Sequence, residues 1–169
     1  MTNLKSLDLM LTTVVEKLTV AFPNSFISAA EFRGETTVIV KKQEIVQICT
    51  FLRDDAASQF DYCSDVCGAD AYTPENRFEV IYNLYSTSLN HRIRVKTLVD
   101  ESDIHCPSVT SVWPGANWPE RETFDMFGII FDGHNDLRRM YMPEEFEYHP
   151  LRKDFPMMGV PDSIPLPRK

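Results

Sequence analysis

Long hydrophobic runs are absent from this 169-residue sequence, and positive charge is scarce. No apolar stretch approaches the ~20 residues that span a bilayer, so the chain is not expected to cross a membrane. The 17 Lys and Arg residues stand against 25 Asp and Glu residues, a net charge of −8. Such a chain repels a phosphate backbone, which argues against a nucleic-acid partner. No arginine precedes Arg33, and no small-residue cleavage site follows the N-terminal apolar residues, which argues against a transit peptide and a secretory signal.

Cysteine is also scarce, with only Cys49, Cys63, Cys67 and Cys106. A zinc ribbon needs paired C-x2-C units, and Cys63-x3-Cys67 has no second pair. Residues four apart share a face of a strand, so this pair is expected to pack as small apolar groups or free thiols. Glycine-rich phosphate-binding motifs and the common nucleophile motifs are missing too. We therefore expect no catalytic centre, cofactor site or metal site in this chain.

What is present, 43% hydrophobic and 25% charged residues, is typical of one globular domain. Apolar residues at helical spacing predict an N-terminal helix that Pro23 ends, and a second helix over residues 45–52. The stripe of the first helix is formed by Leu4, Leu7, Leu11, Val14, Val15 and Leu18. Strands are predicted over residues 26–32, 36–42 and 60–71, with a bulge at Gly68.

Two further strands are predicted where apolar and polar residues alternate, over residues 78–85 and 92–99. The short turn between them predicts an antiparallel hairpin. The resulting order, αββαβββ, indicates an α+β fold: a mixed or largely antiparallel sheet of about five strands with helices on one face. Arg92, Arg94 and Lys96 share one face of the last strand. That face is expected to be solvated beside acidic neighbours, with a docking surface for an acidic partner as the alternative.

A charged segment, E-R-E-T-F-D-M-F-G, follows the Pro114-Gly115 turn at residues 120–128. It is predicted to be helical, with Asn117 near the N-cap, Pro119 in the first turn and Gly128 at the exit.

Within this predicted helix, Glu122 and Asp125 are three residues apart and are expected to share a face. The nearby arginines 121, 138 and 139 are available to pair with them, which favours an ion-pair scaffold. A metal or acid/base site built from Glu122, Asp125 and His134 is the alternative.

The C-terminal part differs in kind from the rest. Six of the 11 prolines lie between Pro143 and Pro167, and residues 138–169 carry a net charge of +1 against −9 for residues 1–137. Closely spaced prolines exclude helix interiors and central strands, while the retained apolar residues are unlike those of a disordered tail. We expect a globular α+β domain at residues 1–137 and an extended arm at 138–169. The arm is expected to lie on a partner, with an arm wrapped on its own domain as the alternative.

Several of these motifs together resemble a known family. The run E-R-E-T-F-D-M-F-G-I, then His134, L-R-R at 137–139, Met142-Pro143 and H-P-L-R-K-D-F-P at 149–156 resemble the 30-kDa-type C-subunit family of respiratory complex I, the proton-pumping NADH:quinone oxidoreductase. The likeness extends upstream through R-F-E-V-I-Y-N-L and H-R-I-R-V-K-T at 77–84 and 91–97. One departure is Asn135, where the family usually has proline.

The resemblance implies a non-catalytic subunit of the peripheral arm, which takes part in electron transfer from NADH to quinone. FMN and iron–sulfur clusters would belong to partner subunits, and this chain would pack on the hydrogenase-like D subunit, which forms the quinone pocket with the B subunit. It implies a peripheral membrane protein on the cytoplasmic side of the bacterial inner membrane, or on the matrix side in an organelle. Carried over by motif, the residues that would hold the partner interface are Glu120, Arg121, Glu122, Asp125, His134, Arg138, Arg139, Pro150, Leu151, Arg152, Lys153 and Asp154.

The resemblance leaves one alternative open. The same signature region would suit the equivalent subunit of a membrane-bound hydrogenase or of a ferredoxin- or F420-linked complex.

Overall fold

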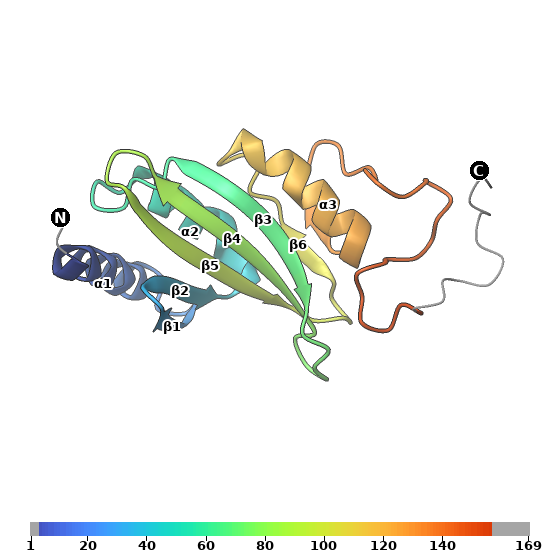
Figure 1. Cartoon of the computed structure of the whole chain (residues 1–169), viewed down its shortest axis with the longest axis horizontal. Helices are drawn as coiled ribbons and strands as arrows, with labels where there is room; N and C mark the ends of the chain where they lie inside the picture. Colours follow the sequence, from blue (N-terminus) through green and yellow to red (C-terminus); the bar gives the residue numbers. More distant parts are fainter. Residues whose placement is uncertain (1–3, 157–169) are drawn as a thin grey trace.

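The computed structural model describes the backbone of residues 4–156 and the side chains of residues 12–156. A five-stranded sheet forms its centre, with helices on one side (Figure 1). The elements are α1 (Leu4–Ala21), β1 (Phe26–Phe32), β2 (Glu35–Val40), the 3-10 turn η1 (Lys42–Glu44), α2 (Ile45–Asp54), β3 (Tyr62–Asp70), β4 (Phe78–Ser86), β5 (His91–Val99), β6 (His105–Pro107), the 3-10 turn η2 (Pro114–Ala116), α3 (Asn117–Phe127) and β7 (Ile130–Asp132).

The strand order of the sheet is β1-β2-β5-β4-β3. The β4–β5 hairpin pairs Phe78 with Val99 and continues in antiparallel register to Ser86 and His91, which confirms the predicted hairpin. The β2–β5 pair is parallel, so the sheet is mixed, as predicted. A small second sheet joins β6 and β7 in parallel. The α+β prediction is therefore confirmed.

The core lies on one face of the sheet. Every second residue of β4, from Phe78 to Ser86, is buried, and the residues between them are partly exposed. On the buried side pack Ile45, Ile48, Cys49 and Leu52 of α2, at the spacing that predicted this helix. In Figure 1 α2 lies behind the sheet and α3 lies beside β3, so no described helix lies over the front face of β3, β4 and β5.

The position of the bulge in β3 corrects two predictions. The register shifts between Cys63 and Asp65, not at Gly68, and the shift reverses the alternation of side chains. Cys63 is buried opposite Leu84, whereas Cys67 is half-buried opposite Ile81. The prediction that the two cysteines share a face was therefore wrong.

Gly68 has a different role from the one predicted. A Cβ built on Gly68 would lie 2.6 Å from Cδ2 of Phe127 and 2.9 Å from Cγ2 of Thr123. The missing side chain is thus what lets α3 approach β3.

The start of α3 lies where it was predicted, with Asn117 directly after the N-cap residue and Pro119 in the first turn. The turn η2 runs directly into the helix, so Ala116 occupies the N-cap position and Asn117 lies inside the first turn. None of the described side chains caps this end. At the other end Gly128 adopts the left-handed conformation, with φ of 78°, and its N–H donates to the carbonyl of Phe124, as the sequence predicted.

Residues 138–156 form no helix or strand, in agreement with their proline content. The rest of the predicted arm, residues 157–169, lies outside the described residues. The division of the chain at residue 137 therefore stays a prediction.

Candidate functional site

The residues of the sequence signature meet where α3 contacts the described part of the arm, residues 138–156. On the inner side of α3, Glu120 is fully buried. Its carboxylate accepts hydrogen bonds from Ser108 Oγ at 2.6 Å and from the N–H of Val109 at 2.8 Å. Burial raises the pKa of Glu120 to about 7, although these two hydrogen bonds act in the opposite direction. Glu120 thereby joins α3 to the loop after β6, with a carboxyl group that titrates near neutrality.

Asp125, further along α3, is the first anchor of the arm. Its carboxylate accepts from the N–H groups of Met140, Tyr141 and Met142 at 3.0, 2.7 and 3.0 Å. Arg139 Nη1 donates to the other oxygen at 2.7 Å. Burial alone would raise the pKa of Asp125, but the hydrogen bonds outweigh it and hold the pKa below its usual value. The predicted pairing of Asp125 with Arg139 is confirmed, and the carboxylate is enclosed by these donors.

The other arginines of the segment serve different contacts. Arg121 is buried, and its guanidinium donates to the carbonyls of Arg138 and Arg139 at 3.0 and 3.3 Å. The same guanidinium lies 5.0 Å from the ring centroid of Trp118, a cation–π contact. Arg138 pairs on the surface with Asp136 at 2.6 Å. Arg121 therefore fixes the course of the arm backbone and does not pair with Glu122.

A second anchor lies at the far end of β3. Asp70 accepts from Arg77 Nη2 at 2.9 Å and from the N–H of Lys153 at 2.8 Å. Arg77 also pairs with Glu101 at 2.8 Å and with Asp154 at 3.0 Å. The hydrogen bond to Asp70, followed by the one to Asp154, raises the pKa of Arg77. This cluster therefore stays charged and holds the arm at a second point.

Between the two anchors, Arg152 and His149 pack against the exit of α3. Arg152 Nε donates to the carbonyl of Phe127 at 2.7 Å. His149 Nδ1 lies 3.0 Å from the carbonyl oxygen of Asp125, and burial lowers the pKa of His149. A Cβ on Gly128 would lie 2.5 Å from His149 Nε2, so the arm requires glycine here.

The structure does not bring Glu122, Asp125 and His134 together. The side chain of Glu122 is exposed, whereas Asp125 is enclosed by the arm. His134 lies at the other end of α3, where its Nδ1 accepts from the N–H of Asp136 and its Nε2 donates to the carbonyl of Asn117 at 3.2 Å. Among the described residues no three His, Cys, Asp or Glu side chains are grouped to hold a metal ion. The described residues therefore do not group these three side chains as a metal site.

The twelve residues predicted at a partner interface divide by exposure. Three are buried in the chain itself: Glu120, Arg121 and Asp125. Four are half-buried: His134, Arg139, Pro150 and Arg152. Five are exposed: Glu122, Arg138, Leu151, Lys153 and Asp154. Contact of these residues with a partner stays a prediction. The three buried residues would not contact a partner directly, and would affect it only by positioning the exposed residues around them.

Three residues of this region were not identified from the sequence. Asp70 precedes Lys153, which it holds, by 83 residues, and Arg77 lies almost as far from its partner Asp154. Ser108 precedes its partner Glu120 by 12 residues. Arg77 begins the upstream run of the resemblance at 77–84, but no local pattern marked it, Asp70 or Ser108 as a residue of this site. The fold alone brings them to the site.

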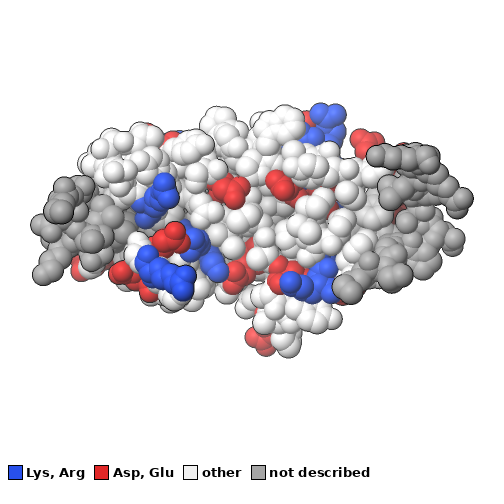
Figure 2. All heavy atoms as spheres, in the orientation of Figure 1, with Lys and Arg blue, Asp and Glu red and all other residues white. Residues whose placement is uncertain are grey.

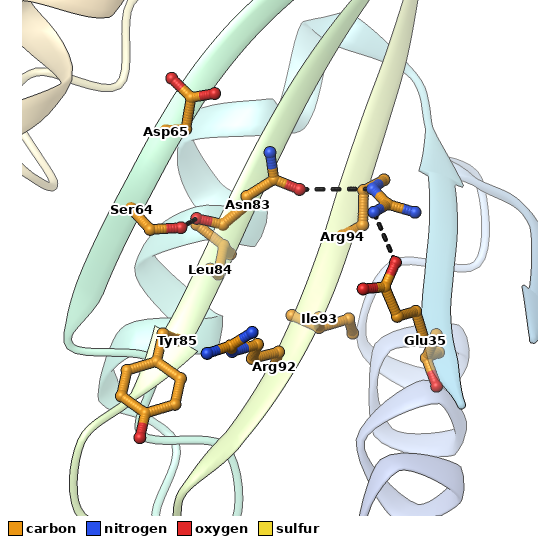
Figure 3. A pocket seen from close by; sticks show the side chains of 10 residues that line it. Glu35, Ser64, Asp65, Asn83, Leu84, Tyr85, Arg92, Ile93 and Arg94 are labelled. Atoms are coloured by element: carbon orange, nitrogen blue, oxygen red, sulfur yellow. Dashed lines mark hydrogen bonds and ion pairs between the residues drawn. The ribbon is translucent and has the colours of Figure 1, made fainter. Parts of the chain in front are cut away.

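On the front face of the sheet, basic side chains lie beside acidic ones and form no single patch (Figure 2). This face carries a hollow of about 360 Å³. Figure 3 shows Arg94 lying between Asn83 and Glu35, with Tyr85 and Arg92 in the lower part of the view. Arg94 Nη2 donates to Glu35 at 2.7 Å, and Lys96 pairs with Glu79 at 2.8 Å. The prediction of a solvated face beside acidic neighbours is confirmed for Arg94 and Lys96.

A family profile described as "Respiratory-chain NADH dehydrogenase, 30 Kd subunit" matches residues 38–161 of the chain. Among curated relatives, the C subunit of NADH-quinone oxidoreductase from Roseiflexus sp. (strain RS-1) is 50% identical over 145 residues, which cover 86% of this chain and 83% of the relative. The C subunit from Geotalea uraniireducens (strain Rf4) is 44% identical over 151 residues, 89% of this chain and 90% of the relative.

Two solved structures are similar to the chain. A trypsin-resistant fragment of Nqo5 has a TM-score of 0.65 and 30% identity, with 76% of this chain and 99% of the fragment covered. A chain of an archaeal membrane-bound sulfane sulfur reductase has a TM-score of 0.72 and 23% identity, with 87% and 86% covered. At that identity the second similarity shows the fold alone.

Proposed function

The chain belongs to the family of the 30-kDa subunit of respiratory-chain NADH dehydrogenase, and from this premise we propose that it is a non-catalytic subunit of a proton-translocating NADH:quinone oxidoreductase. In this role it takes part in electron transfer from NADH to quinone by holding the subunits that form the quinone site. The profile match and relatives at 44% and 50% identity support membership in such a complex.

One observation supports the scaffolding role: two signature residues, together with Asp70, are used to build a surface. Asp125, Arg121 and Asp70 bind the backbone of the arm from inside. The arm then presents large apolar side chains outward, with Tyr141, Tyr148 and Leu151 exposed by 59%, 47% and 53%. Exposed aromatic residues on a pre-organised backbone favour a protein partner. We propose that this surface packs on the hydrogenase-like D subunit and, next to it, on the B subunit.

The cofactors and the location follow from the same proposal. FMN and iron–sulfur clusters would be held by partner subunits. No helix in the described part of the chain is long and apolar enough to cross a bilayer. Membrane association, on the cytoplasmic side of a bacterial inner membrane or the matrix side of an organelle, would come through the complex.

A related membrane complex is the second candidate. The fold is shared with a chain of the archaeal sulfane sulfur reductase, so the architecture also suits the equivalent subunit of a hydrogenase or a ferredoxin- or F420-linked complex. The names of the more similar relatives favour the NADH-linked complex. The partners that co-purify with the chain would decide between them.

The test is recovery of a tagged full-length chain from membranes of its host. We expect flavin- and cluster-bearing subunits to co-purify with the wild-type chain, and Arg152→Glu to lower the yield because it reverses a charge beside Phe127 and Glu101. Arg33→Glu, in the turn between β1 and β2, is the control and should assemble normally. A normal yield of Arg152→Glu complex with impaired turnover would point to chemistry at this site and against a scaffolding role.

A further inference from the structure

A groove lies between α3 and β3, along the outer edge of the sheet. Strand β3 is the last in the strand order, and among the described strands it pairs only with β4. Helix α3 runs alongside it (Figure 1). Between them is a hollow of about 160 Å³, lined by Asp65, Val66, Cys67, Gly68, Glu122, Thr123, Met126, Phe127 and Leu151. Pockets for drug-sized ligands are about 300–1,000 Å³, so this hollow suits a side chain or two of a peptide better than a small molecule.

The backbone of β3 lines the groove with hydrogen-bond donors and acceptors. At one point α3 already contacts this strand, where Thr123 Oγ1 donates to the carbonyl of Val66 at 3.4 Å. Along the rest of β3 the outward N–H and C=O groups have no strand partner in the described chain. An uncovered strand edge beside a helix is the arrangement that takes up an extended peptide as an additional strand.

The side chains add a polarity to the groove. Its apolar side comes from Val66, Met126 and Phe127, with the half-exposed Leu151 of the arm at the margin. Asp65 on β3 and Glu122 on α3 are both exposed, and neither forms an ion pair with a described residue. Two carboxylates on opposite walls without a basic partner are complementary to a basic ligand.

The opposite edge of the sheet offers a useful comparison. A hollow of about 200 Å³ lies between α1 and β1, and it too has two exposed acids, Glu16 and Glu31. Its other lining residues are small or polar except for one valine: Thr12, Val15, Ala29, Ala30 and Thr36. It therefore lacks the large apolar side chains that would bind a peptide firmly, and it is not continuous with the arm as the β3 groove is through Leu151. The β3 edge is the better shaped of the two for an occupant.

We propose that the groove between β3 and α3 binds an extended, lysine- or arginine-containing segment of a neighbouring subunit, which adds to the sheet as a sixth strand next to β3. The inference rests on the proposed function, since it needs the complex to supply the segment. Backbone hydrogen bonds to β3 would fix the register, while Asp65 and Glu122 would select the basic residues.

The test uses the assembled complex and zero-length carbodiimide cross-linking, which joins carboxylates to lysines. We expect Asp65 or Glu122 to cross-link to a lysine of one partner subunit, and peptides of β3 to exchange amide hydrogens more slowly in the complex than in the free chain. The double variant Asp65→Lys/Glu122→Lys should lower recovery in the complex by about tenfold, because like charges then oppose the segment. Glu16→Lys/Glu31→Lys, with the same charge change in the hollow at the opposite edge, is the matched control and should assemble normally.

The outcomes separate the two proposals. If the wild-type chain assembles but β3 exchanges as fast as in the free chain, or the double variant assembles as well as the control, the groove is empty and the inference is wrong while the proposed function stands. Cross-links to a second copy of this chain, or to a helical segment, would also overturn it. If the wild-type chain joins no such complex, the proposed function fails first.

Discussion

Glu120 and Asp125 show how one helix holds two carboxylates in different electrostatic states. Both are fully buried. Glu120 receives two hydrogen bonds and no positive charge from the described residues, so the desolvation caused by burial dominates and its pKa rises to about 7. Asp125 receives three backbone N–H groups and a guanidinium, so its pKa falls. Their residue types alone predict neither state, because the donors lie in other segments.

The first prediction concerns the pH dependence of stability. The folded chain raises the pKa of Glu120 from 4.5 to about 7, so this group binds a proton more tightly when folded. The stabilisation that proton binding at Glu120 gives the folded state is complete below pH 4.5 and is lost as the pH rises through 7. The total loss in the free energy of unfolding is roughly 3 kcal/mol. Urea unfolding of the full chain at pH 5 and pH 8 should show that Glu120→Gln gains stability relative to wild type at the higher pH. Glu122→Gln, exposed on the same helix, should show no such pH-dependent difference.

The second prediction concerns the first anchor of the arm. Asp125→Asn removes the charge that Arg139 faces and leaves fewer acceptors for three N–H groups, so we expect a loss of about 3–5 kcal/mol. Amide exchange at Met140, Tyr141 and Met142 should accelerate more than exchange in β4. Asp136→Asn breaks only the exposed pair with Arg138 and should cost about 0–1 kcal/mol. Equal effects of the two changes would contradict a special role for Asp125.

At the scale of elements, the spacing of apolar residues predicted the strands and helices well, but it did not predict the bulge in β3 or the packing at Gly68. The alternation in β4 and β5 predicted both strands and their hairpin, and the stripe of α2 predicted its buried face. The bulge at residue 64 left no such signal, because Ser64 and its neighbours are ordinary strand residues. Gly68 was predicted to mark the bulge, but glycine is needed there because α3 packs against it. That helix begins at Asn117, far along the chain, so no local pattern reveals the contact.

The third prediction tests the contact between α3 and β3. Gly68→Ala places a Cβ 2.6 Å from Phe127 and 2.9 Å from Thr123, so we expect α3 to shift and the melting temperature to fall. The cost should be about 1–3 kcal/mol. Gly115→Ala is the matched control, since no atom of the described residues lies within 4 Å of the added carbon. That change should stay within about 0.5 kcal/mol of wild type or stabilise the chain slightly. A melting temperature unchanged by Gly68→Ala would show that the contact yields without cost.

At the scale of the whole molecule, the arm is held by its own domain over residues 139–154. The sequence predicted an extended, proline-rich segment with docking residues, and the described part is irregular as expected. The sequence did not predict that Asp70 and Arg77 would hold the arm. These residues meet Lys153 and Asp154 only because the fold places the arm beside the end of β3. The arm can therefore be pre-organised by its own domain and still present a surface to a partner.

The fourth prediction separates these two roles. Deletion of residues 157–169 removes no anchor identified above, since the Arg77 pair is made by Asp154. We expect the truncated chain to keep its melting transition but to be recovered in the complex at a lower yield, because five apolar residues are lost. A full-length variant with Met157, Met158, Val160, Ile164 and Leu166 changed to serine should behave in the same way. Loss of the melting transition in either protein would show that this part stabilises its own domain.

The parallel pairing of β2 with β5 has a kinetic consequence. Strands β3, β4 and β5 follow one another through short connections, so they can pair early, whereas β2 finds β5 only after residues 41–90 have closed into a loop. We expect the meander of β3 to β5 to form first and the first forty residues to dock last. Pulsed hydrogen exchange during refolding should then protect β4 before β2, which would reveal a refolding intermediate with β5 as a temporary sheet edge.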